Sequence, residues 1–211
     1  MRLLVTGGPT REYLDRVRFI SNPSTGLMGD ALAEVARGRG HAVTLVRGPS
    51  PNDPPEGVKV VAVDTTEDMR RACLEAFAGV DAVIMAAAPC DYRPSERHPG
   101  KLKKLAVGEK VILTLVRTPD ILYEMGMRRA PHQRLVGFAV EVDNPEKEAL
   151  AKLERKRLDL VVLNDPSNFG QERGSARLFD RSGELEGIAG TKAEIAEVIL
   201  RHLERILRET S

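Results

Sequence analysis

Small and polar residues that follow the first apolar segment could bind an anion. Gly8 helps to turn the chain there, and Ser24-Thr25-Gly26 stands where a helix is expected to begin. Backbone N–H groups at a helix start favour negative charge, and the two hydroxyls add donors. Asn22, just before them, could hold an uncharged or developing polar group. The alternative is a loop whose side chains only cap the helix.

The length of this connection also points to function. Between Gly8 and Gly26 the chain runs about three times further than the usual two to six residues of a strand-to-helix turn. A long ordered loop at such a point generally carries function.

A second group follows another apolar run. Met85, Ala86 and Ala87 are small or unbranched, so a planar ring could lie against the backbone at this strand end. Asp91 could accept a hydrogen bond from a base or a hydroxyl, or help to hold a metal ion. An Asp that only caps the turn before Arg93-Pro94 is an equal alternative.

Two sets of lysines could neutralise phosphates. Lys101, Lys103 and Lys104 fall within four residues, and lysine commonly binds phosphate as a point charge. Lys152 and Lys156, four apart, would share one helix face. For the first set a solvated charge run is the more common outcome, and a Glu148–Lys152 ion pair is a plausible alternative for part of the second.

Three familiar nucleotide signatures are missing. The sequence contains no Gly-x-Gly-x-x-Gly fingerprint and no Gly-x-x-x-x-Gly-Lys-Ser/Thr loop, which argues against a P-loop NTPase. The residues four positions after the three tyrosines are Val17, Glu96 and Met127, so the Tyr-x-x-x-Lys pair of short-chain dehydrogenases is absent. Hydride transfer is therefore disfavoured.

Composition narrows the class of protein. The chain has 211 residues, 42% of them hydrophobic but only 4% aromatic, so one domain over 1–211 with an aliphatic core is expected. A net charge of +1 gives no general field for nucleic acid or an anionic membrane. Neither a signal peptide nor a membrane span is visible, and two cysteines make no disulfide framework. We expect a cytoplasmic protein.

Apolar strands alternate with helical patterns, which predicts a doubly wound, mostly parallel α/β sheet of Rossmann-like type with ligands at the carboxyl edge. The expected strands are 2–6, 42–46, 58–63, 81–88, 135–141 and 158–164. The expected helices are 26–40, 66–78, 145–157 and 192–208. The segment 92–117 breaks the alternation and is interpreted as a flap, with strand-like residues at 111–116.

The ordered motifs resemble one family, the phosphopantothenoylcysteine synthetases of coenzyme A biosynthesis. The resemblance rests on Thr10-Arg11-Glu12, Asp15, 17–22, 24–26 and 28–29, then on Ala86-Ala87, 91–93, 101–104, 118–122, 136–139 and Asn164-Asp165. Each motif is weak alone, but their order covers nearly the whole chain.

The resemblance implies a ligase that joins 4′-phosphopantothenate to cysteine with CTP and Mg²⁺, through an acyl-cytidylate. It implies a homodimer, with 105–116 as the dimer strand. Many relatives carry a flavin-dependent decarboxylase domain. A chain that starts at the synthetase motif is expected to bind no flavin, and a separate decarboxylase is a possible partner. An NAD(P)-dependent oxidoreductase and a non-catalytic nucleotide-binding protein remain the alternatives.

The resemblance also implies roles for individual residues. Asn22 would hold the carboxyl group and the acyl intermediate, and Lys101 would clamp phosphates as the flap closes. The nucleotide would contact Gly8, Ser24, Thr25, Gly26, Met85, Ala86, Ala87, Asp91, Lys101, Pro119, Asp120, Ile121, Leu122, Phe138, Lys152 and Lys156. Pro9, Leu27 and Cys90 depart from the family pattern. Nothing in the sequence decides between CTP and ATP.

Overall fold

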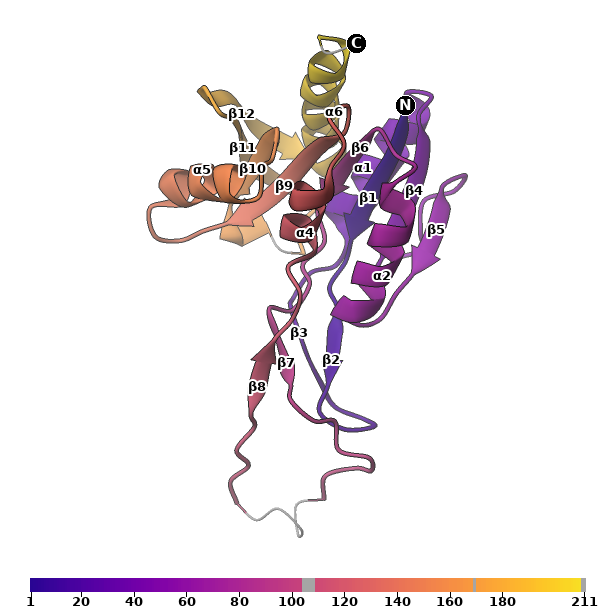
Figure 1. Cartoon of the computed structure of the whole chain (residues 1–211), viewed down its shortest axis with the longest axis vertical. Coiled ribbons are helices and arrows are strands. Elements are labelled where there is room, and N and C mark those ends of the chain that lie inside the picture. Colours follow the sequence, from indigo (N-terminus) through magenta and orange to yellow (C-terminus); the bar gives the residue numbers. More distant parts are fainter. Residues whose placement is uncertain (104–108, 169, 210–211) are drawn as a thin grey trace.

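Six parallel strands form most of an eight-stranded sheet in the computed structural model, which describes residues 1–103, 109–168 and 170–209 (Figure 1). The strand order is β12-β11-β10-β9-β6-β1-β4-β5. The parallel strands are β1 (Arg2–Gly7), β4 (Ala42–Arg47), β5 (Lys59–Ala62), β6 (Ala82–Met85), β9 (Arg134–Val140) and β10 (Leu160–Asn164). The predicted doubly wound sheet is confirmed.

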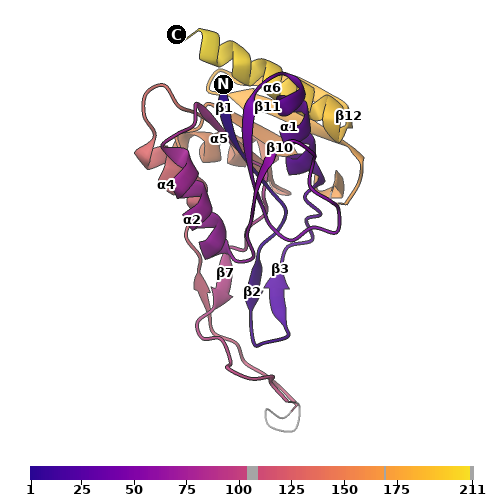
Figure 2. The ribbon, with the colours of Figure 1, turned by 90° about the vertical axis from the view of Figure 1, so that its right-hand side faces the viewer.

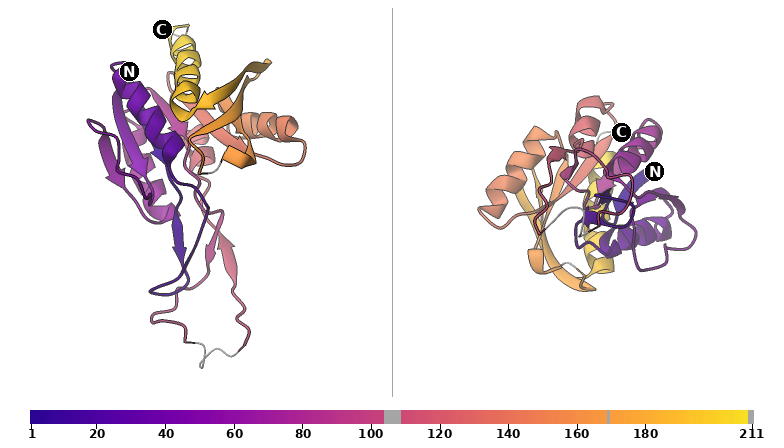
Figure 3. Two further views of the ribbon diagram at one scale, coloured as in Figure 1. Left: turned by 180° about the vertical axis from the view of Figure 1, so that it is seen from behind. Right: turned by 90° about the horizontal axis from the view of Figure 1, so that it is seen from below.

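Helices cover both faces of this sheet. They are α1 (Leu27–Gly38), α2 (Thr66–Phe77), α4 (Ile121–Arg128), α5 (Pro145–Arg155) and α6 (Lys192–Arg208). Neighbouring residues of β1 point to opposite faces: Leu3 packs in the cluster of α1 and α6, and Leu4 in the cluster of α2, α4 and α5. Figures 2 and 3 show the two helix layers. No described helix is long and apolar enough to cross a membrane.

The elements that the sequence did not predict are mostly antiparallel. Strands β11 (Arg173–Asp180) and β12 (Gly183–Thr191) extend the sheet beyond β10, after a short 3-10 turn at Pro166–Asn168. The short strands β2 (Arg11–Tyr13) and β3 (Phe19–Ser21) pair inside the long first loop. Both hairpins lack the continuous apolar run that reveals the buried parallel strands.

An arm extends beyond the carboxyl edge of the sheet (Figure 1). It contains the β2–β3 hairpin and a ribbon of β7 (Tyr92–Pro94) and β8 (Leu115–Arg117). The predicted excursion over 92–117 is thus present, but the strand expected over 111–116 is wrong in extent. Residues 111–114 have no partner strand in the described chain, so only the end of that segment is extended into a pair. Positions 104–108, which include Lys104 and the first residues of the expected dimer strand, lie outside the described residues.

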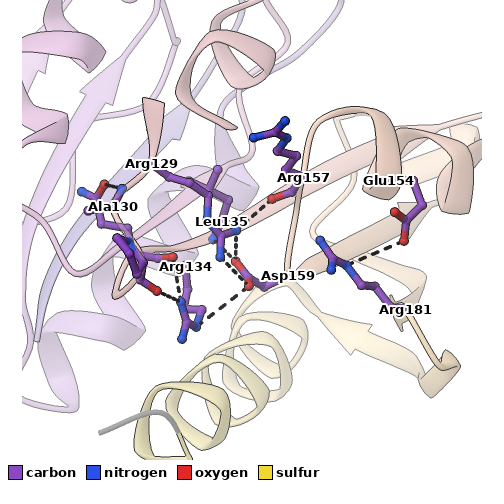
Figure 4. Close-up of polar contacts among 10 residues, drawn as sticks. Arg129, Ala130, Arg134, Leu135, Glu154, Arg157, Asp159 and Arg181 are labelled. Atoms are coloured by element: carbon purple, nitrogen blue, oxygen red, sulfur yellow. Dashed lines mark hydrogen bonds and ion pairs between the residues drawn. The ribbon is translucent and has the colours of Figure 1, made fainter. Parts of the chain in front are cut away.

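The opposite, amino edge is fastened by Asp159 (Figure 4). Its carboxylate accepts the backbone N–H of Leu135 at 2.7 Å and the guanidinium of Arg129 at 2.7 and 3.0 Å. Arg134 adds an ion pair at 3.9 Å. These contacts join the starts of β9 and β10 to the end of α4, and leave the carboxyl ends of the strands free for a site.

Glycines allow three backbones to converge at the carboxyl edge. A Cβ atom on Gly29 of α1 would lie 2.5 Å from the Cα of Gly7 and 2.9 Å from the carbonyl oxygen of Thr6. A Cβ on Gly48, just after β4, would overlap the carbonyl oxygen of Pro9. Helix α1 can therefore begin directly against the end of β1.

We predict that Gly29→Ala lowers the free energy of unfolding, because its methyl group meets backbone that cannot move aside. The expected loss is about 1–3 kcal/mol, the usual cost of overpacking. Gly38→Ala is the matched control in the same helix, since a Cβ there meets nothing within 4 Å. It should be neutral or slightly stabilising. Urea unfolding of both variants provides the measurement, and equal effects would contradict the close contact.

Candidate active site

A cavity of about 500 Å³ opens at the carboxyl edge, where β1, β6, β9 and β10 end. Strand β1 lies between β4 and β6, so the chain winds in opposite directions from it. Such a reversal leaves a crevice at the carboxyl ends of the strands, and ligands of doubly wound proteins bind there. The lining comes from the loop before α1, the loop after β6, the start of α4, one side of α5 and the loop after β10.

Four segments that are far apart in the sequence meet in this cavity. The residues predicted for the site that line it are Asn22, Ser24, Thr25, Gly26, Met85, Ala86, Ala87, Asp91, Pro119, Asp120, Ile121, Leu122, Phe138, Lys152 and Lys156. The structure thus brings together the loop before α1, the small-residue strand end and one of the two lysine sets.

Two predicted residues do not line the cavity. Gly8 has a φ of 78°, and its carbonyl accepts the N–H of Ala88 at 3.0 Å, so it shapes the turn behind the site. Lys101 is exposed on the arm, outside the cavity lining. The structure of one copy does not bring this lysine to the cavity, and its role as a phosphate clamp stays a prediction.

Asn22 is oriented by the loop after β6. Its amide nitrogen donates to the carbonyls of Ala88 at 3.1 Å and Pro89 at 3.0 Å. Both N–H bonds are then used, because a side-chain amide has only two. Among the described residues none donates to the remaining oxygen, Oδ1. Asn22 thus presents an acceptor, which suits an amine or a hydroxyl better than a carboxylate.

The two lysines of α5 differ in how their charges are used. Lys156 donates from Nζ to Asp120 at 2.7 Å, and that same carboxylate oxygen caps α4 by accepting the N–H of Tyr123 at 3.0 Å. No described carboxylate forms an ion pair with Lys152. Burial and, to a lesser degree, the neighbouring charge of Lys156 lower the pKa of Lys152 below its ordinary value. Of the two α5 lysines, Lys152 is therefore the one whose charged form a bound anion would stabilise more.

A buried polar network supports the floor of the cavity. The hydroxyl of Thr10 lies 2.8 Å from that of Thr66 and accepts the N–H of Cys90 at 2.9 Å. Glu12 accepts the N–H of Thr66 at 2.8 Å, at the start of α2, where a carboxylate is stabilised. The Thr-x-Glu part of the first loop is consequently a scaffold that joins the loop to α2 and to the strand-end segment.

Asp15 fastens the lysine-containing part of the arm. Its carboxylate accepts the N–H of Leu102 at 3.0 Å, and Arg18 donates to the carbonyl of that same residue at 2.7 Å. Hydrogen bonds from Arg18, together with backbone N–H groups, hold the pKa of Asp15 well below its usual range. Leu102 lies between Lys101 and Lys103. Asp15 and Arg18 therefore fix the backbone from which both lysine side chains extend.

Sequence reasoning missed a further group in the cavity lining, which comprises Asn164, Asn168, Gln171 and Lys192. Asn164 entered only through the family resemblance. Lys192 was assigned to the last helix without a role. Its place at the first position of α6, where the helix dipole disfavours a cation, is the signal that could have identified it.

The described lining offers few side chains that could hold a metal ion. No group of three or more His, Cys, Asp or Glu residues suited to a metal occurs in the described part of the chain. Asp120 is already bound to Lys156, whereas Asp91 lines the cavity and is exposed. Because Mg²⁺ is usually held by one or two carboxylates plus substrate phosphates, Asp91 fits an ion that arrives with a nucleotide.

Comparisons with known proteins find a matching family model and several relatives. The family model of the DNA/pantothenate metabolism flavoprotein C-terminal domain matches residues 1–207. The coenzyme A biosynthesis bifunctional protein CoaBC of Bacillus subtilis (strain 168) is 38% identical over 214 residues, covering 99% of this chain and 52% of that protein. A crystal structure of the C-terminal domain of CoaBC has a TM-score of 0.83 and 38% identity, covering 99% of this chain and 96% of that one.

Another relative carries a different name. A cysteine/cysteine sulfinic acid decarboxylase from an unknown prokaryotic organism is 41% identical over 208 residues, covering 96% of this chain and 57% of that protein. The chain spans about half the length of the curated relatives it matches.

Proposed function

Because the chain belongs to the family of the DNA/pantothenate metabolism flavoprotein C-terminal domain, we propose that it is a phosphopantothenate–cysteine ligase. It joins 4′-phosphopantothenate to L-cysteine with CTP, releasing CMP and pyrophosphate. The observation that carries the proposal is the meeting of Asn22, the start of α1 and Lys152 in one cavity at the reversal of the sheet. These three groups come from different parts of the sequence. Several of the motifs that carry the family resemblance lie in the segments that line the cavity.

The proposed reaction has two steps. A carboxylate oxygen of phosphopantothenate attacks the α-phosphorus of CTP, the bond to pyrophosphate breaks, and an acyl-cytidylate forms. The cysteine amine then attacks the acyl carbon, the C–O bond to CMP breaks, and the amine loses a proton as the amide forms. The first step brings two anions together, so the site must neutralise charge and align the reactants.

The lining residues suit these demands. Lys152 and the N–H groups at the start of α1 offer positive charge to the phosphates. Met85, Ala86, Ala87 and Phe138 leave room for a flat base. The Oδ1 atom of Asn22 can accept a hydrogen bond from the attacking amine and so orient it toward the acyl carbon. Mg²⁺ carried by the nucleotide, and held by Asp91, would add charge neutralisation.

A second copy of the chain is the proposed partner. Exposed apolar side chains gather on the arm: Val17, Phe19, Tyr92, Val111, Ile112, Leu113 and Leu115. Ile112 is 95% exposed, which is unfavourable for a large aliphatic side chain in water. We propose that the arms of two copies cover each other. A decarboxylase that consumes the product is a further proposed partner.

The central test is an assay of the purified chain with 4′-phosphopantothenate, cysteine and CTP. Pyrophosphate release should require phosphopantothenate, and amide formation should also require cysteine. A parallel assay with ATP decides the nucleotide. Binding of NADPH without turnover of CTP would favour the oxidoreductase, and CTP binding without turnover would favour a non-catalytic protein.

We predict that Asn22→Asp slows amide formation more than pyrophosphate release. The new carboxylate cannot donate to the carbonyls of Ala88 and Pro89, so two hydrogen bonds become repulsions and the side chain turns away from the orientation that aims its acceptor at the amine. Losing one positioned polar group in an active site costs about 10²- to 10³-fold in rate. Single-turnover assays with and without cysteine separate the two steps. The exposed Asn52→Asp is the control, and equal slowing of both steps by the Asn22 variant would refute its role with the amine.

We predict that Ile112→Asp converts the dimer to a monomer, because it places a charge in the proposed apolar contact. Size-exclusion chromatography with light scattering measures the mass. Val142→Asp is the matched control, since Val142 is 80% exposed but lies outside the arm. A wild-type chain that is monomeric at micromolar concentration would overturn the proposed partner.

A further inference from the structure

Lys192 projects into the cavity from the start of α6. Its side chain lines the cavity, yet the residue is only 9% exposed. Its Nζ atom makes one long hydrogen bond, 3.4 Å to the carbonyl oxygen of Asn168. An ammonium group has three donors, so most of its hydrogen-bonding capacity is unused.

No described carboxylate forms an ion pair with Lys192. The nearest acid along its own helix, Glu194, is engaged elsewhere: its carboxylate accepts the N–H of Thr191 at 2.6 Å and the hydroxyl of that residue at 3.0 Å. The side chain of Asn168 is also occupied, bonding Asn164 and the backbone of Ser175. Glu194 is therefore not free to neutralise the ammonium, and the amide of Asn168 carries no charge that could do so.

Two physical effects oppose a charge at this position. Burial disfavours the ammonium form and lowers the pKa of Lys192 below its ordinary value. The residue is also the first of α6, at the positive end of the helix dipole. A lysine kept where stability disfavours it, in a cavity, is a candidate for binding an anion.

The position of Lys192 complements that of Lys152. Helix α5 packs on one face of the sheet, through Leu153, and α6 packs on the other, through Ile195. Both lysines nevertheless line the same cavity beyond the strand ends. Lys192 lies on the face of the sheet that α1 covers. The loop that precedes β11 connects the two helix starts: its Gly170 lies near Thr25, before α1, and the carbonyl of its Glu172 accepts the N–H of Lys192.

We propose that Lys192 binds the pyrophosphate part of the nucleotide, from the face of the sheet opposite Lys152 and beside the start of α1. Positive groups on two sides of one cavity suit a chain of phosphates better than a single carboxylate. This inference rests on the proposed ligase function, since it names a residue for the leaving group of the first step.

Inorganic pyrophosphate, titrated into the purified chain in a calorimeter, tests the proposal. Lys192→Met should weaken its binding about tenfold or more, as expected for a lost charge-assisted contact. Lys192→Arg should retain affinity within about threefold, because it keeps the charge. Lys147→Met, an exposed lysine in the first turn of α5, is the matched control and should bind as the wild type does.

Stability and kinetics separate binding from a structural role. Lys192→Met should unfold at an equal or higher temperature, because it removes a buried, unpaired charge. Its KM for CTP should rise, while the KM for cysteine and for phosphopantothenate stays unchanged. A destabilised variant with unchanged pyrophosphate affinity would overturn the inference, as would a change confined to the KM for phosphopantothenate.

Failure of the subsite and failure of the ligase proposal give different results. If the wild type forms the amide but pyrophosphate binding does not depend on Lys192, only the inference about this residue is wrong. If pyrophosphate binding depends on Lys192 but no amide forms, the anion subsite stands and the ligase proposal is wrong.

Discussion

The backbone contact between Gly29 of α1 and Gly7 of β1 is the constraint on which the site depends. It places the start of a helix directly against a strand end, although a long hairpin loop separates them in the sequence. The loop can therefore leave the sheet, carry its polar residues outward, and return without opening the core. A side chain at Gly29 would push α1 away from the end of β1, and with it the N–H groups at the start of the helix.

Charge in the cavity is distributed among elements that cannot move independently of the core. Lys156 is paired with Asp120, whereas Lys152 and Lys192 have no carboxylate partner among the described residues. Unpaired buried cations cost stability, so the fold must be held by other contacts. The Thr10–Thr66–Cys90 network and the Asp159 cluster provide such contacts at opposite edges of the sheet.

The parallel strands and helices α1, α2, α5 and α6 could be predicted because buried strands need continuous apolar residues and helices need a regular stripe. The short helix α4 (Ile121–Arg128) was not predicted. The sequence also predicted that Asn22, Met85 and Lys152 would lie at one site, because the carboxyl ends of parallel strands share one edge of the sheet. The β11–β12 hairpin and the extent of the strand near Val111 could not, because pairing at a sheet edge or in an arm depends on partners far along the chain. Lys192 was missed although it stands at the expected start of the last helix, because only folding brings that helix start to the cavity.

The fastening of the arm has a consequence for how this sequence can diverge. Asp15 and Arg18 hold Leu102 through its backbone N–H and carbonyl, and make no demand on its side chain. The contact can therefore persist with any residue at position 102 that keeps its backbone N–H, as long as Asp15 and Arg18 are retained. Substitutions at the two ends of this contact would then be uncorrelated, and contact maps inferred from covariation would not detect it.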